Sequence, residues 1–368
     1  HVATQLGIQT FTIRAGLNTE RMLETLCVST RLQSLLGASR SEAWSSAQAL
    51  PMSKGSVEEV SAYIRFLMLG TGAFVYSSAH GVSAPETLRD RFGVAPGQQV
   101  LLCTTSSEDE ILAAELAGGA PPRTTHNLLF ETQLDWLRYV IDMGRRHPEW
   151  CIIVRVHPRE FPNRREGQLS QNALRLQNLL ADLPKNVVVN WPDQGISLYD
   201  LAKITDVLLN HYSSAGIEFL LLGIPVVAHN PDDIFLYPRD FNYSASSLAG
   251  YEQAISQALS DGWSFEHVRK AFRWKTFQFR RLSVDLGSAI PPWSVKSPLR
   301  VLRGLRYKWK WPIPLSSILF VERHRARSRP ARLPDGEVIT DVIRHHRENL
   351  SNSNLWHDDT YATDVEEN

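Results

Sequence analysis

The 368-residue chain has 43% hydrophobic and 21% charged side chains, proportions that are ordinary for a globular protein with room for two domains. Its 39 basic side chains balance 39 acidic ones, so the overall charge favours neither nucleic acid nor an acidic substrate as a partner. No apolar run approaches the roughly 20 residues of a membrane span, and no signal peptide opens the chain. Together with three widely separated cysteines, these features predict a cytoplasmic protein without disulfides.

The first 95 residues show mixed periodicity, and we expect a partial N-terminal α/β domain over 1–95. The opening passes quickly through a turn into a strand and looks like the middle of a domain, so we expect a preceding segment to be missing from this sequence. The expected elements are a strand over 9–13 and helices over 19–36 and 57–69, followed by a Pro- and Gly-containing connection over 84–97.

Residues 96–286 alternate short apolar runs with helical segments. Continuous apolar strands between helices are typical of a parallel sheet that is buried on both faces. We therefore predict an α/β fold, with a doubly wound parallel sheet in a Rossmann-like domain. The expected strands cover 99–103, 151–156, 186–189, 207–209 and 226–228, and the expected helices cover 127–146, 171–180, 198–204, 215–222, 248–259 and 265–282.

The last part of the chain, residues 287–368, has a different character. Basic residues alternate with leucine and tryptophan over 296–311, a pattern that fits an anionic membrane surface, a partner helix, or a helix packed back across the first domain. The polar, acidic end over 350–368 has the composition of a disordered tail. We expect a C-terminal basic extension that can attach the protein peripherally to the inner membrane face.

Polar side chains follow three of the predicted strands at the point where each strand ends. Because the carboxyl ends of parallel strands meet at one edge of a sheet, we expect these side chains to share a ligand. The residues are Thr105 and Ser106 after the first strand, His157 and Arg159 after the second, and His211, Ser213 and Ser214 after the fourth.

These residue types suit a phosphorylated ligand. Ser213 and Ser214 precede a helix, and the first turn of a helix has unpaired N–H groups and about half a positive charge. The His157 imidazole can donate a hydrogen bond to a phosphate oxygen. Glu218 lies one helical turn after Ser214 and can accept hydrogen bonds from ribose hydroxyls. In the structural alternative, the serines only cap the helix and His157 is only solvated.

Two stretches resemble the nucleotide-binding half of GT-B glycosyltransferases. They are IIVRVHPRE at 152–160 and DVLLNHYSSAGIEFLLLGIPVVAHN at 206–230. Within that fold the chain is most similar to the capsule polysaccharide biosynthesis family, whose relatives are bacterial Kdo transferases and sialyltransferases. The resemblance covers about residues 99–280.

The resemblance implies a GT-B-like glycosyltransferase that moves a sugar from a nucleotide-sugar donor, with a CMP-linked donor favoured, to a surface polysaccharide or glycolipid acceptor. It makes 1–95 the acceptor side and 96–286 the donor side, and it implies no metal and no cofactor beyond the nucleotide-sugar substrate. The resemblance implies roles as phosphate contact and acid for His157, as phosphate contacts for Ser213 and Ser214, and as a nucleotide or ribose contact for Glu218. From their place at the strand ends we add Arg159, Thr105 and Ser106 as phosphate contacts and His211 as a nucleotide contact.

The chain departs from related patterns in two ways. Retaining GT-B enzymes often have a second glutamate at the position held here by Val226, which disfavours that subgroup. We also find no convincing general base in residues 1–95. Neighbouring acids that could bind a metal are limited to Asp232 and Asp233, which stand apart from the motifs.

Three alternatives remain open. A CDP-alditol phosphotransferase of the teichoic-acid type also uses a His-Pro pair and a Tyr-Ser-Ser turn, here at 157–158 and 212–214. A nucleotide-sugar epimerase would isomerise the sugar without an acceptor. A non-catalytic nucleotide-binding or assembly subunit would bind the nucleotide without turnover.

Overall fold

The computed structural model describes seven stretches of the chain and a few isolated residues. The stretches are 12–22, 25–29, 41–70, 84–108, 129–160, 169–229 and 237–285. The predicted C-terminal extension and tail over 287–368, with its basic segment at 296–311, lie outside the described residues. The pair Asp232 and Asp233 also lies outside them.

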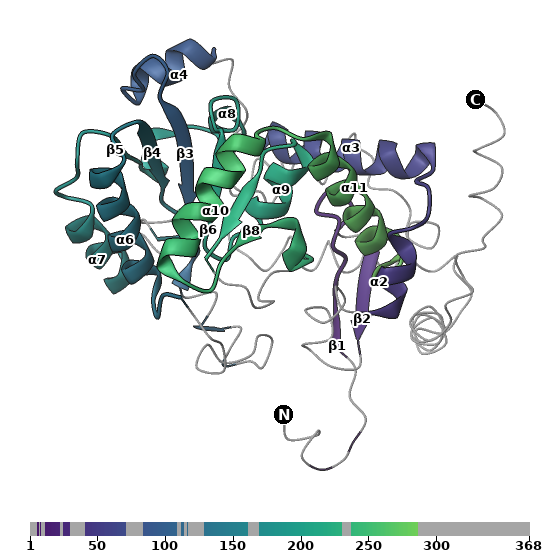
Figure 1. Ribbon diagram of the computed structural model, residues 1–368. Coiled ribbons are helices and arrows are strands. Elements are labelled where there is room, and N and C mark those ends of the chain that lie inside the picture. Colours follow the sequence, from purple (N-terminus) through teal and green to yellow (C-terminus); the bar gives the residue numbers. More distant parts are fainter. Residues whose placement is uncertain are drawn as a thin grey trace, which may run out of the picture.

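A six-stranded parallel sheet forms the larger part of the described molecule (Figure 1). The strand order is β5-β4-β3-β6-β7-β8, and each neighbouring pair is parallel. The strands are β3 (Gln99–Thr104), β4 (Trp150–Arg155), β5 (Val187–Asn190), β6 (Val207–Asn210), β7 (Val226–Ala228) and β8 (Tyr243–Ser244).

Helices cover both faces of this sheet, because successive strand residues belong alternately to two hydrophobic cores. In β3, Val100 and Leu102 belong to one core, and Leu101 and Cys103 belong to the other. The helices are α6 (Gln133–Arg146), α7 (Gln171–Leu179) and α10 (Leu248–Asp261) on one side, and α8 (Leu198–Leu201), α9 (Ala215–Leu221) and α11 (Phe265–Arg280) on the other. The predicted α/β fold with a doubly wound parallel sheet is confirmed.

The chain changes direction across the sheet between β3 and β6. From β3 it moves to β4 and β5 on one side, and it then returns to place β6, β7 and β8 on the other side. Loops that leave adjacent strands on opposite sides of such a point diverge and leave a crevice at the carboxyl edge, where ligands bind in open α/β sheets. The position of any ligand site is therefore set by topology alone.

The N-terminal stretches form a second, smaller arrangement. An antiparallel sheet of order β1-β2-β9 pairs β1 (Thr12–Ala15) and β2 (Thr25–Ser29) with β9 (Val284–Asp285). Helices α2 (Glu42–Ala47) and α3 (Lys54–Leu69) pack against α11, and α4 (Pro85–Arg91) precedes β3. The chain thus returns to its first strands after it completes the parallel sheet.

One prediction about this part is wrong. The helix expected over 19–36 is replaced in part by β2, because Leu26 pairs with Ala15 and with Val284, a partner far along the chain. The segment 84–97, expected as a connection between domains, contains α4, which begins with Pro85 at its first position, where proline is favoured. The proposed domain limits at 95/96 and 286/287 stay predictions.

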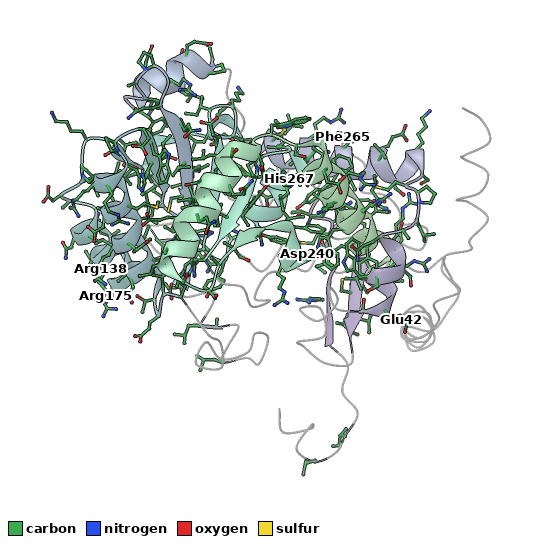
Figure 2. The ribbon with its side chains drawn as sticks, viewed as in Figure 1. Glu42, Arg138, Arg175, Asp240, Phe265 and His267 are labelled. Atoms are coloured by element: carbon green, nitrogen blue, oxygen red, sulfur yellow. The ribbon has the colours of Figure 1, made fainter. Side chains whose placement is uncertain are left out.

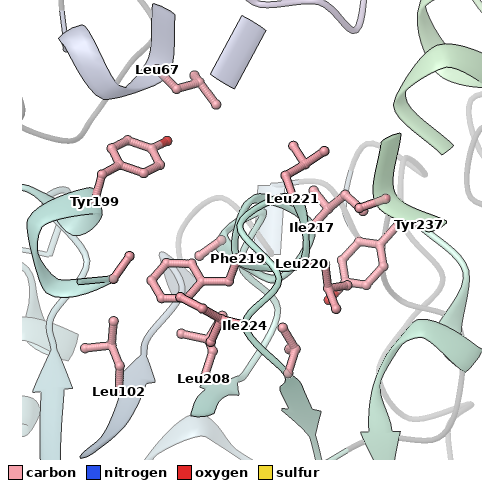
Figure 3. Packing of buried hydrophobic residues seen from close by; sticks show 14 of the residues in the cluster. Leu67, Leu102, Tyr199, Leu208, Ile217, Phe219, Leu220, Leu221, Ile224 and Tyr237 are labelled. Atoms are coloured by element: carbon pink, nitrogen blue, oxygen red, sulfur yellow. The ribbon is translucent and has the colours of Figure 1, made fainter. Parts of the chain in front are cut away.

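The core beneath α9 is densely apolar (Figure 3). Phe219 is fully buried and lies close to Leu208 and Ile224, while Leu67 of α3 and Tyr199 of α8 approach from the other side. Truncating a buried phenylalanine of this kind costs about 3–5 kcal/mol. Packing therefore fixes α9, and with it the turn that precedes the helix.

Charged side chains lie on the outer surfaces of the helices. Figure 2 shows Glu42, Arg138 and Arg175 directed away from α2, α6 and α7, and all three are exposed. Among the described helices, none has both the length and the apolar character needed to cross a bilayer.

Candidate functional site

The three predicted loops meet at the carboxyl edge of the sheet and are joined in a row by hydrogen bonds. The His157 N–H donates to Thr105 Oγ1 (2.8 Å), which ties the loop after β4 to the loop after β3. The Tyr212 N–H donates to Ser106 Oγ (3.1 Å), which ties the loop after β6 to the same β3 loop. The row spans the switch point between β3 and β6, where a ligand is expected.

Asn210, the last residue of β6, holds the turn that contains the two serines. Its Oδ1 accepts hydrogen bonds from the Thr104 hydroxyl (3.2 Å) and the Ser213 N–H (3.2 Å). Its Nδ2 donates to the Ser213 carbonyl (2.9 Å) and the Tyr237 hydroxyl (3.3 Å). Asn210 is fully buried, so these bonds fix the turn against the sheet. The sequence analysis did not identify it, although an asparagine that ends an apolar strand is a visible signal.

Ser213 and Ser214 use their hydroxyls differently. Ser213 Oγ accepts a hydrogen bond from the Ala215 N–H (3.2 Å) and so serves the start of α9. Ser214 is exposed, and its Oγ donates to Glu218 Oε1 one turn later (3.1 Å). The structure therefore brings Ser214 and Glu218 together as one pair at the edge, while Ser213 is engaged with backbone.

Gly216 lets α9 approach the Asn210 side chain closely. A Cβ at this position would lie 2.0 Å from Tyr237 Oη and 2.6 Å from Asn210 Nδ2. Both distances are far below van der Waals contact, so any larger side chain displaces the clamp that holds the serine turn. The glycine at this point of the helix is required by packing.

The tautomer of the His157 ring is set by a hydrogen bond from the backbone. Its Nδ1 accepts from the Arg159 N–H (3.3 Å), so the neutral ring carries its hydrogen on Nε2. Burial, with smaller contributions from the charges of Arg159 and Arg155, lowers the pKa of His157 from 6.5 to about 4. An anion bound nearby would oppose this effect and raise the pKa again.

The other predicted phosphate-binding residues help to hold the loops of the site in place. Thr105 and Ser106 are buried, and their hydroxyls hold the backbone of His157 and Tyr212 as described. Arg159 is half-buried and contributes its N–H to His157 and its positive charge to the surroundings of the ring. Arg155 is buried and donates to Asn190 Oδ1 and to the Ile196 carbonyl (2.8 Å).

Two further residues hold the loops and were not identified from the sequence. Gln133, at the start of α6, accepts from the Ser106 N–H (2.6 Å) and donates to the Ser106 carbonyl (3.2 Å). Glu160 is buried and accepts from the Glu108 N–H (3.0 Å) and from the Asn172 amide (3.0 Å). Both join loops that are distant in sequence, so only the tertiary structure shows their roles.

His211 lies in an aromatic cluster on the α6 and α10 side of the sheet. Its ring centroid is 5.3 Å from that of Trp136 and 4.8 Å from that of His229, and only 2% of the residue is exposed. The structure therefore buries His211 in the core and does not present it beside the exposed Ser214. Its role as a nucleotide contact stays a prediction.

Glu218 is the most unusual carboxyl group of the site. It is buried, and its Oε2 accepts a hydrogen bond from the Tyr199 hydroxyl (2.9 Å). Burial raises its pKa above 4.5, and this is opposed by the bond from Tyr199, the charge of Lys275 and the bond from Ser214. Among the residues that the structure describes, no group of three or more His, Cys, Asp or Glu side chains is arranged to hold a metal ion.

Comparisons with known proteins give only partial likenesses. No protein-family model matches the chain. No curated protein matches it either. Among solved structures, the wall teichoic acid polymerase TagF matches with 16% identity over 53% of this chain and 39% of its own, with a TM-score of 0.27. The β-Kdo 2,4 transferase KpsC of Thermosulfurimonas dismutans matches with 12% identity over 74% of this chain and 81% of its own, with a TM-score of 0.36.

A third similar structure is the UDP-GlcNAc 2-epimerase from Neisseria meningitidis bound to UDP-GlcNAc. It has 14% identity over 51% of this chain and 44% of its own, with a TM-score of 0.30. The chain thus spans less than half the length of the polymerase and of the epimerase. At these TM-scores the likenesses do not bear on ligand or reaction, and any function must be argued from the site.

Proposed function

We propose that this protein is a GT-B-type glycosyltransferase that binds the nucleotide of a sugar donor at the carboxyl edge formed by β3, β4 and β6. The observation that carries the proposal is the row of hydrogen bonds that joins the three edge loops across the switch point. The half-buried His157 and the exposed Ser214 follow two of these strands at the same edge. The sequence resemblance supports the same interpretation and favours a CMP-linked sugar.

Breaking a glycosyl–phosphate bond builds negative charge on the departing nucleotide, and donors fixed in advance at that position lower the barrier. In the proposed mechanism the Nε2–H of His157 donates to a phosphate oxygen. The phosphate charge raises the pKa of the ring, so that Nδ1 takes up a proton from water in place of its hydrogen bond from the Arg159 N–H. The Nε2 proton then passes to the oxygen of the leaving phosphate, and the ring is neutral again with its hydrogen on Nδ1. The Ser214 side chain contacts the same nucleotide, and Thr105 and Ser106 hold the loops in place.

The acceptor in this proposal is a surface polysaccharide or glycolipid at the inner membrane face, as the family resemblance implies. The group that deprotonates the acceptor hydroxyl is not assigned to any residue of this chain. The roles of Arg159 as a phosphate contact and of the 296–311 segment as a membrane contact are part of the same proposal. The reaction is proposed to proceed without a metal.

Nucleotide binding is the first test. We would measure melting temperature and calorimetric affinity with CMP, CDP, UMP, UDP and GDP on the wild-type chain and on His157→Ala and Ser214→Ala. A ligand at about 100 times its Kd adds about 2.7 kcal/mol, which corresponds to a rise of roughly 5–10 °C in melting temperature. We expect one cytidine nucleotide to bind and each substitution to weaken it about 10- to 100-fold.

Ser247→Ala is the matched control, because Ser247 is likewise an exposed serine at the N-cap of a helix, but of α10, where its Oγ accepts a hydrogen bond from the Gly250 N–H (3.1 Å). It should leave the affinity unchanged. Nucleotide affinity that is unchanged in His157→Ala and Ser214→Ala would refute the proposed site. With a binding nucleotide in hand, product analysis separates sugar transfer with CMP release from transfer of an alditol phosphate, and absence of turnover identifies a binding subunit.

A further inference from the structure

The loop that carries His157 is a tight turn. The Glu160 N–H donates to the His157 carbonyl (3.0 Å), which closes a β-turn over 157–160. Pro158 occupies the second position, where the fixed backbone angle of proline suits such a turn. Within the same turn the Arg159 N–H donates to His157 Nδ1 (3.3 Å). The orientation of the His157 ring is therefore coupled to the conformation of this turn.

Glu160, the last residue of the turn, has a buried side chain that hydrogen bonds in two directions. Only 2% of the residue is exposed. Its Oε1 accepts from the Glu108 N–H (3.0 Å) in the segment after β3. Its Oε2 accepts from the Ser170 hydroxyl (3.3 Å) and from the Asn172 side-chain amide (3.0 Å) at the start of α7. The side chain thus connects the turn to two elements that are distant in sequence.

A carboxylate suits this position better than a neutral side chain of the same shape. Each of these three groups donates a hydrogen bond, and an ionised carboxylate offers only acceptors. Ser170 accepts from the Ala173 N–H (3.0 Å) as the N-cap of α7, so its one hydrogen is available for Glu160. The negative charge also lies close to the positive end of this helix. A glutamine here would direct its NH2 group at one of the donors.

Both ends of the turn are held against the segment after β3. At the first residue, the His157 N–H donates to Thr105 Oγ1 (2.8 Å). At the last residue, the Glu160 carboxylate accepts from the Glu108 N–H, further along the same segment. Two attachments fix the orientation of a short turn, whereas a single attachment lets it rotate. Without the bonds of Glu160, the His157 ring therefore loses its fixed place at the edge of the sheet.

We propose that Glu160 is a positioning residue: its buried carboxylate fixes the turn over 157–160 and thereby the His157 ring at the carboxyl edge of the sheet. Glu160 does not touch the ligand and acts only through His157. The effect on nucleotide binding rests on the proposed function. The effect on the His157 ring does not depend on that function.

The first readout of the experiment needs no ligand. The ring nitrogens of His157 are followed by proton–nitrogen NMR in the wild-type chain, in Glu160→Gln and in Glu160→Asp. Glu160→Gln places an NH2 group among donors, and Glu160→Asp keeps the charge but is too short to reach both Glu108 and α7. Asp206→Asn is the matched control, because Asp206 Oδ2 also accepts from a backbone N–H, that of Val100 (2.7 Å), but at the opposite end of β3.

We expect a single tautomer in the wild type, with the hydrogen on Nε2, because Nδ1 accepts from the Arg159 N–H. In both Glu160 variants the turn loosens, so the His157 ring should populate both tautomers. Its pKa should rise from about 4 towards 6.5 as water reaches the ring. Asp206→Asn should give the wild-type spectrum. His157→Ala assigns the signals.

The second readout is the Kd for CMP, measured on the same variants alone and combined with His157→Ala. Glu160→Gln should weaken CMP binding about tenfold, a loss similar to that of one hydrogen bond to a charged group. In the His157→Ala background the same substitution should change the Kd by less than about twofold, because the ring through which Glu160 acts is absent. A general packing defect would weaken binding equally in both backgrounds.

Two results would overturn the proposal. The first is a His157 ring spectrum that is unchanged in both Glu160 variants. The second is a loss of CMP affinity that is as large in the His157→Ala background as in the otherwise wild-type chain. If Glu160→Gln does not fold, Glu160→Asp provides both readouts. A wild-type chain that binds no nucleotide refutes the proposed function, whereas the ring spectrum without ligand decides the role of Glu160 separately.

Discussion

Buried polar groups on the two faces of the sheet differ in the partners that surround them. On the face covered by α9 and α11, Glu218 and Lys275 are both buried; Glu218 accepts a hydrogen bond from the Tyr199 hydroxyl, and the Lys275 ammonium lies over the Tyr63 ring. On the face covered by α6 and α10, His211 and His229 pack against Trp136, and neither ring nitrogen of His229 has a hydrogen-bond partner among the described residues.

This difference between the two faces shows under which conditions a buried group keeps its charge. Burial disfavours the charged form of any group, and only an opposite charge or hydrogen bonds to that form can counter this. The first face provides hydrogen bonds to Glu218, whereas on the second face neither ring nitrogen of His229 has such a partner among the described residues. Burial lowers the pKa of His229 from 6.5 to about 3, so this ring is neutral at physiological pH. His229 therefore acts as a neutral packing group.

The largest expected effect comes from removing one partner of the charged face. Glu218→Leu removes the negative charge that opposes the effect of burial on the Lys275 ammonium, and it should destabilise the protein by about 3–5 kcal/mol. Adding Lys275→Met should restore much of this loss, because the double variant buries no charge. Urea denaturation of the two single variants and the double variant measures the coupling. Strictly additive losses would show that the two residues do not interact.

The burial of His229 should make the free energy of unfolding depend on pH. The unfolded chain protonates His229 below about pH 6.5 and the folded chain only near pH 3, so the unfolded state binds more protons in this window and stability falls as the pH is lowered. At about 1.4 kcal/mol per pH unit, His229→Leu should gain roughly 2–3 kcal/mol relative to the wild type between pH 6.5 and 4.5. The measurement is the free energy of unfolding against pH. Parallel curves for the two proteins would contradict the assignment.

The helix of the charged face depends on close approach at Gly216. Gly216→Ala places a methyl group against Tyr237 Oη and Asn210 Nδ2 and should destabilise the protein by about 1–3 kcal/mol, although alanine favours helix. Gly55→Ala in α3 is the control, because the nearest atom to its Cβ, Arg280 Nη2, is 3.5 Å away. It should be neutral or stabilising. Equal melting temperatures for the two variants would argue against the clamp.

The smallest effect on stability is expected from a substitution in the loops that form the candidate site. Thr105→Val removes the acceptor of the His157 N–H and should cost about 1–2 kcal/mol while it weakens nucleotide binding. Thr205→Val removes a hydroxyl that donates to the Leu201 carbonyl (2.7 Å) before β6 and should not change nucleotide affinity. Calorimetry on both variants separates a change at the site from a general loss of stability.

Much of the parallel sheet could be predicted from sequence, because a strand that is buried on both faces is an uninterrupted apolar run. The expected strands over 207–209 and 226–228 agree with β6 and β7 to within one residue. The antiparallel sheet could not be predicted in the same way, since Leu26 pairs with Val284 and no local pattern encodes such a partner. The short strand β8 was missed for the same reason.

The site was predictable only in part. Strand ends locate the edge loops, so the meeting of Thr105, His157 and Ser213 follows from the fold class. Residue type alone did not show that His211 is buried, whereas the alternation along β6 places it on the same side as Leu209 of the second core. Glu218 and Lys275 stand on two helices that are distant in sequence, so the burial of both residues becomes visible only after folding.

The most direct test of the nucleotide site is an NMR titration of His157 and His229 with CMP. We predict that the His157 ring signals shift as CMP is added and that the pKa of His157 rises from about 4, because a phosphate lies close to Nε2. The signals of His229 should stay unchanged, since its ring is fully buried in the aromatic cluster. Unchanged His157 signals at saturating CMP, or shifts confined to His229, would contradict a phosphate site at this edge of the sheet.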